Sequence, residues 1–146
     1  MKILFSPSEA KTAVSPNKFI DRNDFIFQNL YEKRCEILKI YDEFLQTTGL
    51  EQISKLFGVK NLTDEPSLRE SLFKKGAVKA ILRYDGVAYK HFDYRSLDSA
   101  AQEFIDKNTL IFSNLFGPVT AADMLPEYKL KQGERIDGLK LEEFYR

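Results

Sequence analysis

The sequence predicts an α/β fold, leaning towards α+β, with a mixed β-sheet flanked by several helices. Two apolar runs of strand length, Lys2–Ser6 and Thr109–Ser113, lie near the two ends of the chain. Between them, apolar residues recur at three- and four-residue steps, as on the buried face of a helix. The 146 residues fit one domain, residues 1–146, with one hydrophobic core.

The first predicted element is a short buried strand, Lys2–Ser6, which Pro7 ends. The segment from Ser6 to Asn17 follows it and is rich in Ser, Pro and Thr, which indicates a loop. Loops that follow a strand end often carry function, although a plain surface turn explains the same composition.

Three helices are predicted next, because each periodic apolar segment is followed by a glycine that suits a helix end. The first contains Ile37, Leu38 and Tyr41 on one face. The predicted boundaries run from Asn23 or Asp24 to Gly49, from Leu50 to Gly58, and from Thr63 or Asp64, with Pro66 in the first turn, to Gly76.

The remaining segments predict a mixture of short elements. Ala77–Tyr84 fits a helix or a strand equally well, and Asp85-Gly86 is a turn signal. Asp98 is a helix cap, and the strand Thr109–Ser113 is expected to break at Gly117-Pro118. A further short strand is predicted over Glu127–Leu130, and Phe144 and Tyr145 are expected to belong to an ordered element.

Composition excludes several classes of protein. The 22 basic and 22 acidic side chains give a net charge of +0, so no overall field attracts nucleic acid or an anionic membrane. A local basic surface is still compatible with this composition, because charges can segregate on folding. No apolar run approaches the roughly 20 residues of a membrane span. The single cysteine suits a reducing compartment, so we expect a cytoplasmic protein without membrane contact.

The common catalytic and phosphate-binding motifs are missing, including G-x-x-x-x-G-K-[ST], G-x-G-x-x-G, G-x-S-x-G and H-E-x-x-H. His91, the one histidine, is interpreted as a surface or partly buried polar residue. Cys35, beside Arg34, is either a peroxide-sensitive thiol or, by preference, a small core residue. Asp85, Asp93 and Asp123 are interpreted as solvated turn carboxylates. We therefore expect no metal, no cofactor and no conventional enzyme activity.

Three blocks resemble the YaaA family. The first is Ile3 to Pro7 followed by Ala10-Lys11-Thr12, similar to I-S-P-A-K-T with Ser8 and Glu9 inserted. The second, Tyr84 to Tyr89, is similar to F-x-G-D-V-Y. The third runs from Ser113 to Gly133 and is similar to S-G-L-Y-G … P-L-D … P-Y-R-L-E-M-G. It departs from that pattern at Asn114, Phe116 and Lys129, where the family has Gly, Tyr and Arg.

The resemblance implies a YaaA-like fold whose C-terminal part is missing, because family members continue further. It implies a role in peroxide stress, in which members lower intracellular iron and so limit damage to DNA. A member binds DNA through a positively charged cleft, so the implied partner is double-stranded DNA.

The residues of the blocks suggest a cleft between the first and third. The hydroxyl groups and the Lys11 amine that follow the first strand suit a phosphate. Positive charge is added by Lys129, Lys131 and Arg135. The rings of Tyr84 and Tyr89 either stack on a base or belong to the core. The candidate ligand- or DNA-binding residues are Ser6, Pro7, Ser8, Lys11, Thr12, Tyr84, Gly86, Tyr89, Ser113, Asn114, Gly117, Tyr128, Lys129 and Lys131.

Two other interpretations stay open. One is an enzyme that acts on a small phosphorylated or oxidised substrate in the same cleft, with Tyr89 or Lys11 as the acid–base group. The other is a truncated chain that associates with itself through exposed strand edges.

Overall fold

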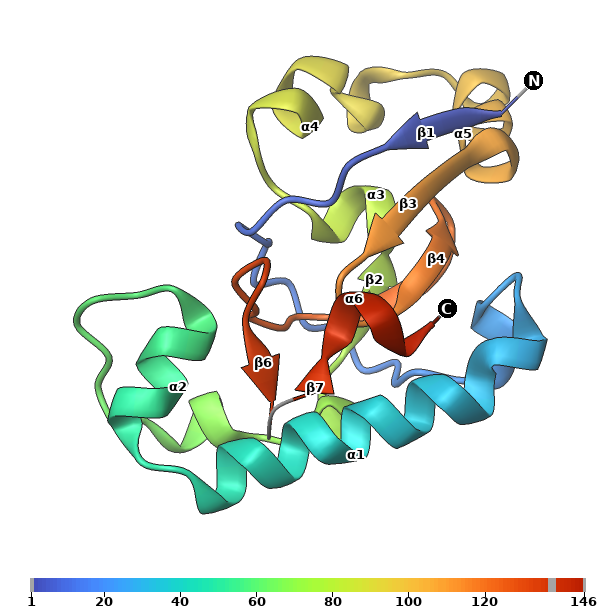
Figure 1. Ribbon diagram of the computed structural model, residues 1–146. Helices are drawn as coiled ribbons and strands as arrows, with labels where there is room; N and C mark the ends of the chain where they lie inside the picture. The colour runs from blue at the N-terminus through green and yellow to red at the C-terminus, as the bar shows by residue number, and fades with distance from the viewer. Residues whose placement is uncertain (1, 137–138, 146) are drawn as a thin grey trace.

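A computed structural model describes residues 2–136 and 139–145 and shows a mixed sheet with helices around it (Figure 1). The largest sheet has the order β1-β3-β4, formed by β1 (Ile3–Phe5), β3 (Thr109–Ser113) and β4 (Gly117–Thr120). β1 runs parallel to β3, while β4 runs antiparallel to it. The mixed α/β class is confirmed, and so are the strands predicted at Lys2–Ser6 and Thr109–Ser113. β1 is not fully buried, however, because Leu4 is 67% exposed.

Two smaller ladders complete the strands of the described residues. β2 (Ala77–Lys79) pairs antiparallel with β5 (Met124–Pro126), and β6 (Arg135–Ile136) pairs with β7 (Leu139–Lys140). The strand predicted over Thr109–Ser113 ends at Ser113, before Gly117-Pro118, as expected. Gly117-Pro118 also begins a further strand, β4, which was not predicted. Gly117 takes the left-handed φ of 72° that the turn needs, and Pro118 lies on an edge strand, where a missing N–H is tolerated.

The strand predicted over Glu127–Leu130 is also wrong. The backbone there bonds to groups outside any sheet: the Lys129 N–H donates to the Tyr41 hydroxyl (3.3 Å) and the Lys131 N–H donates to the Leu56 carbonyl (2.7 Å). Tyr128 and Leu130 are buried although they belong to no strand.

Two α-helices follow in the middle of the chain, α1 (Tyr31–Thr47) and the shorter α2 (Leu50–Phe57). The prediction for α2 is confirmed at both ends, and Gly58 has the expected left-handed φ of 72°. The predicted start of α1 is wrong: Asn23 and Asp24 belong to a separate 3₁₀ turn, which Asp21 caps through the Asn23 N–H.

The third predicted helix is wrong as a continuous element, because it consists of two 3₁₀ turns, Pro66–Arg69 and Leu72–Lys74. Asp42 of α1 separates them by accepting hydrogen bonds from Ser71 Oγ (2.6 Å) and the Leu72 N–H (3.1 Å). The ambiguous segment after Gly76 contains both structures, β2 and then α3 (Ala80–Arg83).

The C-terminal half adds α4 (Val87–Phe92), α5 (Ser99–Asn108) and α6 (Leu141–Phe144). Asp98 caps α5 as predicted, because its carboxylate accepts the Ala101 N–H at 2.8 Å. Phe144 and Tyr145 pack against the core, which confirms that they belong to an ordered element. None of the helices within residues 2–136 and 139–145 has the length and apolar character of a membrane span.

The core lies between α1 and the strands (Figure 1). Two buried arginines hold its sides together. Arg34 of α1 donates to the carbonyls of Phe27 (2.9 Å), Phe116 (2.9 Å) and Pro118 (2.6 Å). Arg83 of α3 donates to the carbonyls of Thr12, Gly76 and Leu125 at 2.8 to 3.0 Å. Each arginine therefore ties a helix to carbonyls of both a loop and a strand.

Candidate functional site

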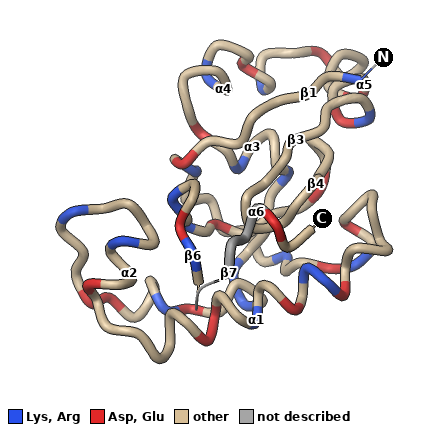
Figure 2. Tube along the Cα trace, in the orientation of Figure 1, with Lys and Arg blue, Asp and Glu red and all other residues tan. Residues whose placement is uncertain are grey.

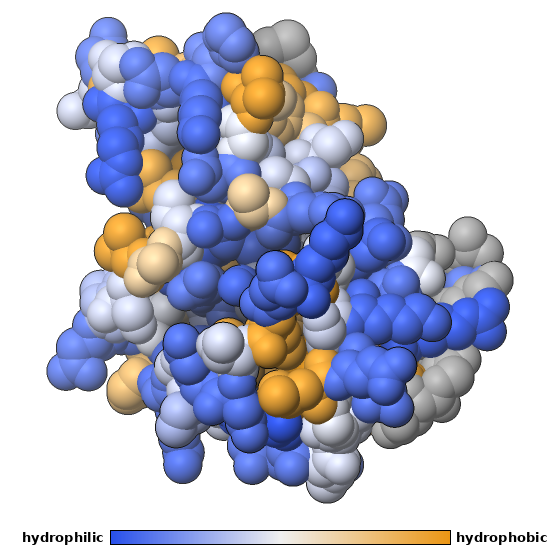
Figure 3. All heavy atoms as spheres, turned by 90° about the vertical axis from the view of Figure 1, so that its left-hand side faces the viewer, coloured by the Kyte–Doolittle hydropathy of each residue, from blue (hydrophilic) through white to orange (hydrophobic). Residues whose placement is uncertain are grey.

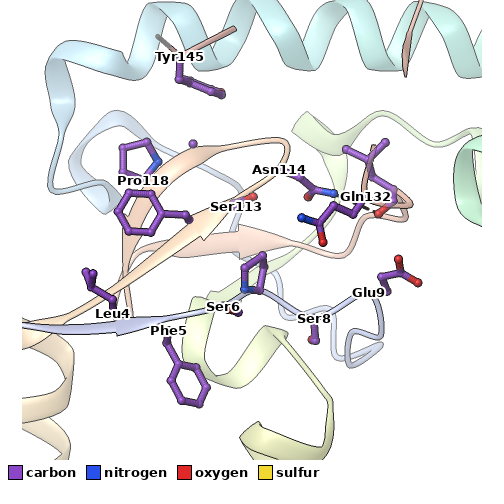
Figure 4. A pocket seen from close by; sticks show the side chains of 14 residues that line it. Leu4, Phe5, Ser6, Ser8, Glu9, Ser113, Asn114, Pro118, Gln132 and Tyr145 are labelled. Atoms are coloured by element: carbon purple, nitrogen blue, oxygen red, sulfur yellow. Dashed lines mark hydrogen bonds between the residues drawn. The ribbon is translucent and has the colours of Figure 1, made fainter. Parts of the chain in front are cut away.

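A pocket of about 620 Å³ lies where the first and third sequence blocks meet (Figure 4). It opens beside the ends of β1 and β3. Because these strands are parallel, their carboxyl ends reach the same edge of the sheet, and the polar segments after them face each other there. The lining residues are Leu4, Phe5, Ser6, Pro7, Ser8, Glu9, Phe112, Ser113, Asn114, Gly117, Pro118, Leu130, Gln132 and Tyr145.

A hydrogen-bonded network fixes the floor of this pocket. Ser113 Oγ lies 2.9 Å from the Tyr128 hydroxyl, which lies 2.7 Å from the Tyr84 hydroxyl. Tyr128 also donates to Asn114 Oδ1 at 3.3 Å. Burial raises the pKa of both tyrosines well above the ordinary value, so these phenols stay protonated and act as neutral hydrogen-bonding groups.

Ser113 is held from the other side as well, because Oγ accepts the N–H groups of Leu115 (3.3 Å) and Phe116 (3.0 Å). The Asn114 amide donates to the Leu130 carbonyl at 3.2 Å. Both polar side chains of the third block are therefore positioned before any ligand arrives.

Lys11 lies beside the pocket rather than in its lining. Its amine donates to the Glu9 carbonyl at 2.7 Å and sits 4.4 Å from the ring centre of Tyr128 and 5.7 Å from that of Tyr84. Burial lowers the pKa of Lys11 to about 8, while the Glu9 and Glu127 carboxylates oppose this shift.

The structure gathers six of the predicted site residues in the pocket lining: Ser6, Pro7, Ser8, Ser113, Asn114 and Gly117. Of the two roles left open for Tyr84 and Tyr89, the core role is the one found. Tyr84 is 2% exposed and Tyr89 is 9% exposed, so neither presents a free ring face for stacking. Tyr89 instead donates to the Ser6 carbonyl at 2.6 Å and supports the loop.

The other predicted residues lie outside the pocket. The Thr12 hydroxyl donates to the Leu82 carbonyl at 3.0 Å, and Tyr128 is 1% exposed beneath the pocket. Gly86 precedes α4, where an added Cβ would lie 3.2 Å from Ser8 Cβ. Lys129 and Lys131 are exposed, and Lys129 lines a second, smaller cavity of about 210 Å³.

Sequence reasoning missed several pocket residues, among them Leu4, Glu9, Phe112, Gln132 and Tyr145. Glu9 and Gln132 lie within the first and third blocks, so the blocks themselves carried a usable signal. Tyr145 gave none, because only the tertiary structure brings its ring against Gly117 and its hydroxyl to the Leu115 carbonyl (2.8 Å).

Among the described residues, no group of three or more His, Cys, Asp or Glu is arranged to hold a metal ion. His91 is exposed on α4 and Cys35 is half-buried on α1. The interpretation of Asp123 as a solvated carboxylate is wrong. It is 3% exposed and accepts hydrogen bonds from Thr120 Oγ1 (2.6 Å) and the Ile26 N–H (3.2 Å). Burial raises the pKa of this carboxyl, which makes it a structural group.

Comparison with known proteins places this sequence in a family. The family model described as peroxide stress protein YaaA matches residues 1–146. An uncharacterized protein of Campylobacter jejuni is 44% identical over 146 residues, which are all of this chain and 59% of that protein.

UPF0246 proteins of Corynebacterium glutamicum and Streptomyces coelicolor are 31% and 30% identical, over 93% and 95% of this chain and 53% and 54% of their own lengths. The chain thus spans a little over half the length of these curated relatives. With a family model matching along the whole chain, this protein belongs to the peroxide stress protein YaaA family.

Proposed function

We propose that this chain supplies a ligand-binding pocket to a cytoplasmic peroxide stress protein that lowers intracellular iron and thereby protects DNA. The observation that carries the proposal is the convergence of the first and third family blocks on one pocket (Figure 4). Its volume of about 620 Å³ falls in the range of small-molecule sites. The rigid network beneath Ser113 and Asn114 is the kind of support that a binding site requires.

The test fills the pocket without touching its floor. Ser6 is exposed in the lining, so Ser6→Phe adds a large ring to the pocket, and Ser99→Phe, at the exposed start of α5, is the matched control. Cells that lack the native gene receive each variant and are challenged with hydrogen peroxide. We expect Ser6→Phe to lose protection and to leave more chelatable iron by electron paramagnetic resonance, while Ser99→Phe protects normally. Normal protection by both variants would refute the proposal.

Contact with double-stranded DNA is proposed outside the pocket, at the exposed basic residues Lys129, Lys131 and Arg135. The Lys131 N–H bonds to the Leu56 carbonyl and so places this segment beside the exposed Lys55 of α2. Figure 2 shows basic positions on α2 and on the segment leading to β6, which also carries acidic positions. The same side of the molecule is largely hydrophilic (Figure 3).

Salt dependence tests the DNA contact. In Lys129→Ala/Lys131→Ala, the slope of log affinity against log salt concentration is expected to fall by about 0.9 for each lost phosphate contact. Lys39→Ala, on the exposed side of α1, is the control and should keep the wild-type slope. An unchanged slope in the double variant would show that these lysines do not contact DNA phosphates.

A second candidate function is an enzyme that acts on a small phosphorylated or oxidised substrate. The observation in its favour is Lys11, whose pKa of about 8 suits proton transfer near neutral pH. Tyr89 fits this role poorly, because burial raises its pKa and its hydroxyl already donates to the Ser6 carbonyl. Screening for turnover distinguishes an enzyme from a binding protein, and Lys11→Arg should abolish turnover because arginine keeps the charge but does not release a proton.

A further inference from the structure

The pocket has two chemically different ends (Figure 4). Leu4 and Pro118 lie at one end. Phe112 also lines the pocket, and Leu4 and Phe112 are 67% and 54% exposed. Strand register builds this wall, because Phe112 of β3 stands opposite Pro118 of β4. Large apolar side chains held open in a pocket favour a ligand with an apolar or aromatic body.

The other end carries the hydrogen-bonding side chains Asn114 and Gln132 with Ser8 and Glu9 (Figure 4). The Asn114 amide is oriented by Tyr128 and Leu130. Ser8 Oγ donates to the Ala10 carbonyl, which leaves its lone pairs to accept a hydrogen bond. Side-chain amides offer a donor and an acceptor in one plane, the pattern that matches the edge of a heterocyclic base.

The charge of the lining argues against an anionic ligand. Among the described residues that line the pocket, Glu9 is the one Asp or Glu and there is no Lys or Arg. The nearby amine of Lys11 is turned to the Glu9 carbonyl and the tyrosine rings. Phosphate sites are typically built from Arg or Lys side chains or from converging backbone N–H groups, so the cradle expected from Ser6, Ser8 and Lys11 lacks its cation.

We infer that the pocket binds an uncharged heterocycle of the nucleobase or nucleoside class, with its ring against Phe112 and Pro118 and its polar edge at Asn114 and Gln132. This inference rests on the proposed function, because it takes the same pocket as the ligand site. It specifies the ligand by its lack of charge and its flat, hydrogen-bonding ring.

Calorimetry on the intact chain tests the inference with adenosine, guanosine, cytidine and thymidine and with their 5′-monophosphates. We expect at least one nucleoside to bind and its monophosphate to bind about tenfold more weakly, because the phosphate meets a carboxylate and no lining cation. Gln132→Leu should weaken nucleoside binding by about tenfold, since a hydrogen-bonded pair is lost. The matched control Gln52→Leu, exposed on α2, should bind normally.

The Glu9→Gln variant tests whether the Glu9 carboxylate causes the weaker binding of the monophosphate. For an uncharged ligand, nucleoside affinity should stay within about threefold while the gap to the monophosphate narrows. Monophosphates that bind as well as nucleosides, or nucleoside binding lost in Glu9→Gln, would overturn the inference but leave a ligand site in the pocket. If no nucleoside binds and Ser6→Phe still protects cells, both the inference and the proposed function fail.

Discussion

Gly117 shows how a single residue shapes the pocket. Its φ of 72° lies in the left-handed region, and an added Cβ would come within 2.8 Å of the Tyr145 ring. Sequence reasoning identified Gly117 as a site residue and a strand breaker, but the ring that demands a glycine lies far along the chain. The resemblance thus marked the position, while its cause required the tertiary structure.

Gly117→Ala is expected to lower the free energy of unfolding by about 2 to 4 kcal/mol, from the strained backbone and the displaced Tyr145 ring. Urea denaturation measures the loss. Gly49→Ala is the control, because φ there is −73° and the nearest atom is the flexible end of Gln52. Its loss should stay below about 1 kcal/mol. Equal losses would show that Tyr145 does not pack on Gly117.

Lys11 predicts how the stability of the fold depends on pH. Its folded pKa is about 8 and its ordinary value is 10.5, so between these values the unfolded chain binds more protons. Stability therefore gains from Lys11 as pH rises through that window, and below pH 8 the buried charge costs stability. Lys11→Met removes the charge, so its advantage over wild type should shrink by about 2 kcal/mol between pH 7.5 and 10. Chemical denaturation at each pH measures the free energy of unfolding, and Lys39→Met, which removes an exposed lysine from α1, is the matched control.

At the scale of elements, local signals predicted what local chemistry decides. The sequence alone located α2 with Gly58 and the capping of α5 by Asp98, because each boundary depends on neighbouring residues. The failures have distant causes. Asp42 divides the third predicted helix, and the Tyr41 hydroxyl and the Leu56 carbonyl take the backbone groups around Lys129 that a strand would need.

The candidate site follows the same division. Ser6, Ser8, Ser113 and Asn114 were predictable, because polar residues after parallel strands meet at one edge of the sheet. A core position for Tyr84 was one of the two roles that the sequence left open. Its contact with the Tyr128 hydroxyl was not predictable, since only the packed structure brings the two hydroxyls together.

Arg34 joins two elements, because its guanidinium on α1 donates to the Phe116 and Pro118 carbonyls, which flank Gly117 at the start of β4. Arg34→Met keeps most of the side-chain volume but removes the Arg34 donors from the Phe116 and Pro118 carbonyls, while the Phe27 carbonyl keeps the Leu30 N–H at 3.0 Å. We expect a loss of about 3 kcal/mol in unfolding free energy. Lys39→Met, exposed on the same helix, should change stability by less than about 0.5 kcal/mol. A small loss for Arg34→Met would mean that water satisfies these carbonyls.

At the scale of the whole molecule, the outer face of the main sheet is unusually apolar. Leu4 and Leu110 are paired in register, and Phe112 follows on the same face. β1 and β4 are the edges of this sheet among the described strands. Arg34 already binds the Pro118 carbonyl of β4, so β1 is the edge that we assign to pairing. We propose that two copies of this chain associate through this face and edge at high concentration.

Sedimentation velocity tests the association over a range of protein concentrations. The sedimentation coefficient of the wild type is expected to rise with protein concentration. Phe112→Ser should suppress this rise, because it removes the exposed aromatic ring from the face. Phe104→Ser is the control, since Phe104 is 44% exposed on α5. Because Phe112 and Leu4 also form the apolar end of the pocket, a bound nucleoside should weaken the association. A wild-type chain whose sedimentation coefficient is independent of concentration would rule out the self-association, and the apolar wall would then be explained by the ligand alone.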